Sequence, residues 1–248
     1  MAYRYIKNTP ATEITQTTEA LKPAWRLTRR WLAGIVMAIG LFLLGNAVFP
    51  IVYYQLYLSP RFALKPGESF VIAQENTAGQ PILADTIDLV DYTKLSNWIS
   101  GVDQLPVSTQ TTNYRLSIPK LGIQSAVVMV GGDDLKTSLI QYPGTSLPGK
   151  PGNPVIFGHS TLPQLTRSGN YKSIFTFLPK LQEGDALWVD IDGVTYKYLI
   201  ERLVEMGPND LSILAQRYDD AYLTLVTCVP PGTYLKRLVV RARITKAD

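Results

Sequence analysis

The chain has 248 residues, of which 46% are hydrophobic and only 18% are charged, and its formal net charge is +4. This length suits one or two domains with a packed core, and the lack of a dense basic stripe argues against nucleic acid as a partner. The single cysteine excludes an internal disulfide, so the cellular compartment has to be inferred from other features.

The most apolar stretch is WLAGIVMAIGLFLLGNAVFPIVYY, residues 31–54, which contains no charged residue. A helix needs about 20 apolar residues to cross the hydrocarbon core of a bilayer, so this stretch predicts a transmembrane helix. Trp31, Tyr53 and Tyr54 stand where interfacial aromatic side chains are expected. A cleaved signal peptide fits less well, because its apolar stretch covers only about 7–15 residues and follows a shorter leader.

The charges that flank this helix predict its orientation. The basic residues are Lys22, Arg26, Arg29 and Arg30 on the N-terminal side, against Arg61 and Lys65 on the other. Under the positive-inside rule, residues 1–30 form a cytoplasmic tail and the rest of the chain lies outside the plasma membrane. The tail is polar and has no apolar period, which indicates disorder. Residues 55–112 are of mixed composition and predict a stalk or N-terminal extension, with a helix within residues 85–100.

From Asn113 onward the chain consists of short β-rich runs separated by frequent turn signals. YRLSIPKLGIQSAVVMV, residues 114–130, predicts two strands that are broken around Pro119 and Gly122. PVIFGH, residues 154–159, begins with an apolar run that is typical of a buried strand.

Four further strands follow. Residues 186–206 predict a hairpin that turns at Asp192 and Gly193, a pair favoured by type I′ geometry. Residues 221–228 and 236–244 predict the last two strands.

Helical candidates lie between these strands at residues 172–181 and 209–216, the second with Asn209 or Asp210 as its N-cap. Many short strands with little helix predict an all-β fold, a β barrel over residues 113–248, preceded by one transmembrane helix.

The predicted strands bring three reactive side chains to one rim of this barrel. If residues 221–228 and 236–244 pair as antiparallel strands, Cys228 and Arg237 face each other across the mouth of their hairpin. His159, the only histidine, follows the buried strand at residues 154–159.

A thiolate nucleophile, a histidine that can donate a proton and an always-charged arginine together suit acyl transfer. A buried structural Cys228 and a surface Arg237, like Arg241 and Arg243, remain the alternative interpretations.

These residues resemble the sortase family. TLVTC (224–228) is similar to the T-L-x-T-C signature of sortases, and Arg237 matches their arginine position nine residues later. NPVIFGHS (153–160) resembles the segment that carries the sortase histidine, and YPGTSLPGKPGN (142–153) resembles its lead-in. The resemblance covers residues 113–248.

The resemblance implies an eight-stranded closed barrel and a membrane-anchored cysteine transpeptidase of the bacterial cell surface. Its substrates would be proteins with a Leu-Pro-x-Thr-Gly (LPXTG) sorting signal, cut between Thr and Gly through a thioester, and its acceptor an amine of a peptidoglycan precursor or a pilin lysine. By this resemblance Cys228 is the nucleophile, His159 the acid/base and Arg237 the substrate and oxyanion clamp. Thr227 either contacts substrate or is simply an inward-facing barrel residue.

The chain departs from parts of the family pattern. It has no Asp-Pro pair, the motif of the lid found in pilin-building sortases, so that subclass is less favoured. Asp133 and Asp134 are adjacent acids, but their sequence GGDDLKTS predicts a turn with a helix cap, and we expect neither a metal nor another cofactor. L,D-transpeptidases place His and Gly directly before their cysteine, where this chain has Val226 and Thr227. A membrane-anchored β domain that binds cell-wall polymer or a partner protein without catalysis is the alternative function.

Overall fold

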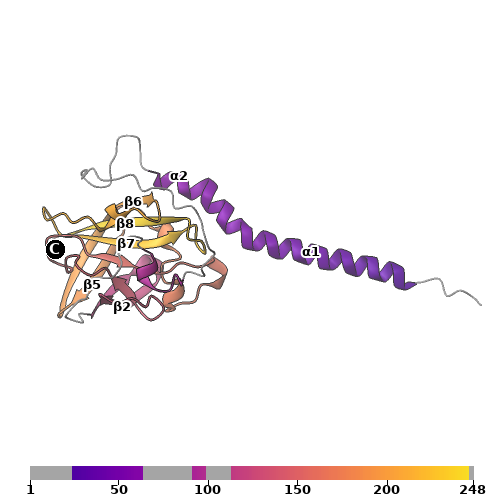
Figure 1. Ribbon diagram of the computed structural model, residues 1–248, viewed down its shortest axis with the longest axis horizontal. Helices are drawn as coiled ribbons and strands as arrows, with labels where there is room; N and C mark the ends of the chain where they lie inside the picture. Colours follow the sequence, from indigo (N-terminus) through magenta and orange to yellow (C-terminus); the bar gives the residue numbers. More distant parts are fainter. Residues whose placement is uncertain (1–23, 64–90, 99–112, 246–248) are drawn as a thin grey trace, which may run out of the picture. The chain divides into compact units, whose positions relative to one another are not determined.

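In the computed structural model, the described residues are 24–63, 91–98 and 113–245 (Figure 1). The chain divides into two compact units, residues 1–45 and 46–248. Helix α1 (Ala24–Tyr53) continues through a π-helical turn, η1 (Tyr54–Leu58), into α2 (Ser59–Phe62). The part from Trp31 to Phe62, with mean hydropathy 2.4, is long and apolar enough to cross a membrane.

Eight strands close into a barrel in the order β1-β2-β3-β4-β7-β8-β6-β5, which confirms the predicted fold class (Figure 1). The strands are β1 (Asn113–Ile118), β2 (Ile123–Val130), β3 (Leu139–Gln141), β4 (Val155–Phe157), β5 (Ala186–Ile191), β6 (Val194–Met206), β7 (Tyr222–Val229) and β8 (Lys236–Ile244). Sequence reasoning missed β3, because its two apolar residues and one glutamine form neither an alternation nor a continuous apolar run like that of β4.

The turns lie where glycines and proline predict them. The β5–β6 hairpin turns at Asp192 and Gly193, whose φ angles of 51° and 77° fit the type I′ geometry. Between β1 and β2, a short 3₁₀ helix, η3 (Pro119–Leu121), ends at Gly122, which has a φ of 69°.

The helical candidates between strands are all short 3₁₀ turns. Residues 172–181 contain η6 (Leu178–Lys180) and most of η5 (Tyr171–Ser173), and residues 209–216 contain η7 (Leu211–Leu214). A further 3₁₀ turn, η4 (Pro163–Leu165), lies where no helix was predicted. Asp210 caps η7, as expected, by accepting a hydrogen bond from the backbone N–H of Ser212 at 3.0 Å. Of the helix expected within residues 85–100, the described part is 91–98, which contains the 3₁₀ helix η2 (Leu95–Asn97).

Alternate residues of β7 belong to two different cores. Leu223 and Leu225 belong to a cluster that takes residues from all eight strands and fills the barrel. Val226 and Cys228 belong to a second cluster, on the outer face of the same strands. Because successive strand residues point to opposite faces, Cys228 lies outside the barrel proper, under the segment at residues 91–98.

Candidate functional site

Cys228 and Arg237 meet at the open end of the β7–β8 hairpin. The two strands are antiparallel, and their register pairs Cys228 directly with Arg237, as the sequence predicts. Nη1 of Arg237 donates a hydrogen bond to Sγ of Cys228 at 3.2 Å. Both side chains are buried, with exposed fractions of 1% and 3%. Arg237 is therefore not a surface charge but a cation held against the thiol.

His159 reaches the same rim from the neighbouring strand. β4 runs parallel to β7, and the ladder continues through the N–H of Gly158, which donates to the carbonyl of Val226 at 3.1 Å. A side chain at position 158 would collide with the Phe175 ring, since a Cβ there would lie 2.5 Å from it. Glycine thus allows the close packing that brings His159 near Cys228. Nε2 of His159 is buried and makes no hydrogen bond within the part of the chain that the structure describes.

Thr227 points to the opposite face of β7 from Cys228 and is fully buried. Its hydroxyl donates a hydrogen bond to the carbonyl of Gly158 at 2.8 Å, one residue before His159. A second hydrogen bond joins the same two segments, since the Ser160 hydroxyl donates to the carbonyl of Cys228 at 2.6 Å. In this position Thr227 holds the histidine-bearing segment.

We expect Thr227→Val to lower the melting temperature and the rate of any Cys228-dependent reaction. Valine has a similar shape but no hydroxyl, so the carbonyl of Gly158 loses this donor, at a cost of about 1–3 kcal/mol. Thr227→Ser retains the donor and should stay close to wild type in both measurements. Equal behaviour of the two variants in thermal unfolding and in kinetics would contradict this role.

The site is covered by the segment at residues 91–98. Trp98, which is 1% exposed, lies with its ring centroid 5.4 Å from that of His159 and 6.0 Å from that of Phe157. The guanidinium of Arg237 stacks over the same indole at 4.9 Å, a favourable cation–π distance. Tyr92 stacks on Tyr234 of the β7–β8 loop, with centroids 4.0 Å apart. The structure therefore shows a closed site.

Asp133 fastens this cover to the barrel. Its carboxylate accepts a hydrogen bond from the backbone N–H of Ser96 at 2.8 Å, and its carbonyl accepts one from the N–H of Leu95 at 2.9 Å. The sequence at Asp133 and Asp134 was predicted to form a turn with a helix cap. The turn is present, and Asp134 accepts a hydrogen bond there from the N–H of Lys136 at 2.9 Å, but no helix follows, and Asp133 binds the cover instead. Among the described residues, no group of three or more His, Cys, Asp or Glu side chains is placed to hold a metal.

Burial shifts both candidate reactive groups to their neutral forms. It raises the pKa of Cys228 from 9.0 to about 11, although the positive charge of Arg237 partly offsets this rise. Burial also lowers the pKa of His159 from 6.5 to about 4, against a smaller opposite effect of Asp134 and Asp91. Near pH 7 the closed site therefore holds a thiol and a neutral imidazole, which is an unreactive pair.

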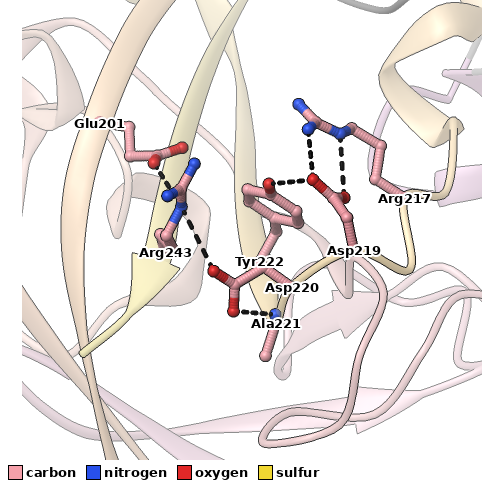
Figure 2. Close-up of polar contacts among 7 residues, drawn as sticks. All are labelled: Glu201, Arg217, Asp219, Asp220, Ala221, Tyr222 and Arg243. Atoms are coloured by element: carbon pink, nitrogen blue, oxygen red, sulfur yellow. Dashed lines mark hydrogen bonds and ion pairs between the residues drawn. The ribbon is translucent and has the colours of Figure 1, made fainter. Parts of the chain in front are cut away.

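A second polar cluster surrounds Tyr222, at the other end of β7 (Figure 2). The carboxylate of Asp219 is bound by Arg217 at 2.5 Å and by the Tyr222 hydroxyl at 3.1 Å. Arg243, at the end of β8, pairs with Glu201 at 2.6 Å, and its side chain is 47% exposed. Arg243 is thus the kind of strand-end surface charge that Arg237 is not.

Sequence reasoning missed the aromatic residues of the closed site, Trp98, Tyr92 and Tyr234. Two of them lie in a polar extension where the only available signal was the aromatic residues themselves. Nothing local indicates that a tryptophan at position 98 packs against a histidine at position 159.

Comparison with known proteins identifies one family. The model of the Sortase domain family matches residues 116–245, just over half of the chain. No curated protein matches the chain.

Three solved structures illustrate the similarity. Sortase A from Corynebacterium diphtheriae is 28% identical over 56% of this chain and 63% of its own, with a TM-score of 0.49. Sortase C-1 from Actinomyces oris is 26% identical over 56% of this chain and 77% of its own, with a TM-score of 0.49. The sortase D5 transpeptidase of Clostridium perfringens is 25% identical over 56% and 83%, with a TM-score of 0.48.

Proposed function

The chain belongs to the sortase family, and from that premise we propose that Cys228 is the nucleophile of a transpeptidase acting on LPXTG-type sorting signals. The observation that carries the proposal is the hydrogen bond of 3.2 Å between the Arg237 guanidinium and the Cys228 sulfur. A fixed cation beside a thiol stabilises the thiolate, which is the form that attacks a carbonyl.

The reaction then has two acyl-transfer steps. His159 first takes the proton of the Cys228 thiol. Sγ then attacks the carbonyl carbon of the signal's Thr and forms a thioester, while the Thr–Gly peptide bond breaks and His159 gives that proton to the departing amine. An incoming amine then attacks the thioester, loses a proton to His159 and forms a new amide, which releases the thiol of Cys228. Arg237 is suited to stabilise the oxyanion in both steps, since its guanidinium retains its charge when buried.

Membership of the family also suggests an acceptor amine and a cellular location. We propose an amine of a peptidoglycan precursor or a pilin lysine as the acceptor, and the bacterial plasma membrane as the site of action. The helix that begins at Ala24 would cross the membrane once, with the N-terminus in the cytoplasm and the barrel outside.

The proposal is tested with the full chain in detergent, mixed with a library of Leu-Pro-x-Thr-Gly-type peptides and an amine such as triglycine. We expect a product in which the peptide, ending at Thr, is joined to the amine, detected by mass spectrometry. Cleavage without this adduct would indicate hydrolysis, and a folded protein that acts on no peptide would contradict the proposed substrate class. Product formed equally by Cys228→Ala would contradict the proposed nucleophile.

A further inference from the structure

Helix α1 contains Pro50, and a residue of the barrel domain provides the hydrogen bond that the proline cannot donate. Pro50 has no N–H, so the carbonyl of Asn46, four residues earlier, lacks its partner within the helix. Nε2 of Gln164 donates a hydrogen bond to this carbonyl at 2.8 Å and to Oδ1 of Asn46 at 3.0 Å. Gln164 belongs to η4, in the loop that follows His159. The Asn46 carbonyl, which has no partner within the helix, is therefore bound by a residue of the histidine-bearing loop.

A second contact lies further along the same helix, at Glu205 of β6. The carboxylate of Glu205 is buried, and it accepts hydrogen bonds from the hydroxyl groups of Tyr54 and Ser59, both at 2.7 Å. Lys236, the first residue of β8, completes the set with its ammonium 2.8 Å from Glu205 and 3.3 Å from Ser59. Hydrogen bonds to a charged acceptor are the stronger kind, and three converge here.

Apolar packing joins the same helical residues to the barrel. Tyr54 is 3% exposed and Phe62 is 7% exposed, and both belong to the cluster that fills the barrel. Residues 46–62 therefore share the core of the catalytic domain. The large apolar side chains between Trp31 and Leu44, in contrast, are exposed.

Both contacts lie next to groups that the proposed reaction uses. Gln164 is in the segment that carries His159, and Lys236 immediately precedes Arg237. Glu205 immediately precedes Met206, which pairs with Arg237 across the β6–β8 ladder. The Gln164 contact is therefore next to His159, and the Glu205 contact is next to Arg237.

We propose that residues 46–62, which we call the brace, hold the His159 loop and the start of β8 in their reactive positions. Gln164 and Tyr54 are then positioning residues for the reaction at Cys228. This inference rests on the proposed function. It deepens that function by making the end of the membrane anchor a part of the active enzyme.

The test compares full-length variants in detergent by steady-state kinetics with an LPXTG peptide. We expect Gln164→Leu and Tyr54→Phe each to lower kcat about three- to tenfold with KM changed less than about twofold, because each removes one hydrogen bond and leaves peptide binding intact. Tyr53→Phe, on the exposed neighbouring residue, is the matched control and should behave as wild type. A wild-type kcat in both Gln164→Leu and Tyr54→Phe would overturn the proposal.

A second background separates positioning from a general loss of packing. In a chain with Asn46→Ala and Pro50→Ala, the N–H of residue 50 can bond the carbonyl of residue 46, and the side-chain acceptor is gone. We expect this background to show the lowered kcat already and Gln164→Leu to reduce it no further. The same reduction by Gln164→Leu in both backgrounds would show that Gln164 acts elsewhere and would overturn its role.

Alkylation of Cys228 by iodoacetamide distinguishes failure of the brace from failure of the proposed function. If wild type transfers no peptide, the proposed function fails, but the brace still predicts that Gln164→Leu changes the alkylation rate at least about twofold while Tyr53→Phe does not. An unchanged rate in Gln164→Leu would then overturn the brace as well.

Discussion

Replacing Cys228 by alanine should abolish peptide transfer, with a loss of roughly 1000-fold or more in kcat. The proposed thioester needs the sulfur, and removing the nucleophile from an acyl-transfer site leaves only the much smaller effect of substrate binding and the oxyanion clamp. The measurement is adduct formation between an LPXTG peptide and an amine, followed by mass spectrometry. In wild type, a thioester on Cys228 should be trapped at short times.

The fold should survive this change. Cys228 lies at the end of β7 and its side chain is small, so the alanine variant removes one contact with Arg237 and little packing. Cys228→Ser, which keeps a hydrogen-bond acceptor for Arg237, is the matched control for that contact and should be equally inactive. Activity in either variant would remove Cys228 from the mechanism and favour a binding domain without catalysis.

Replacing Trp98 by alanine should have the opposite effect, with alkylation of Cys228 accelerated about ten- to hundredfold at pH 7.5. Trp98 covers His159 and stacks on Arg237, so its loss admits water to the thiol. Burial disfavours the charged thiolate and raises the pKa of Cys228 to about 11. Hydration should return this pKa towards 9.0, and a decrease of two units corresponds to about 100-fold more thiolate at neutral pH.

The pH dependence of alkylation shows directly whether the pKa of Cys228 falls when Trp98 is removed. The midpoint for wild type should lie well above that for Trp98→Ala, because thiolate forms only as the pH rises through the pKa. Trp98→Phe retains an aromatic ring over the site and should fall between the two. Tyr218→Ala removes an exposed aromatic residue elsewhere and serves as the control. Equal midpoints in all four proteins would mean that residues 91–98 do not limit access to Cys228.

The sequence alone predicts most of the barrel and the pairing of Cys228 with Arg237. Strand alternation, the turn at Asp192 and Gly193, and the proline-rich turn between β7 and β8 are all local patterns. Local patterns determine hairpins because the register of two antiparallel strands follows from the turn that joins them. The short β3 is the exception, since its two apolar residues and one glutamine form neither an alternation nor a continuous apolar run.

Only the tertiary structure decided how the site is closed and how the helix ends. Trp98 meets His159 and Arg237, and Gln164 meets Asn46, across separations of many residues in the chain. No turn joins these pairs, so no local pattern specifies their contact. Their position follows from the burial of aromatic surface and from polar groups that need a partner once water is excluded, and both become defined only when the barrel has folded.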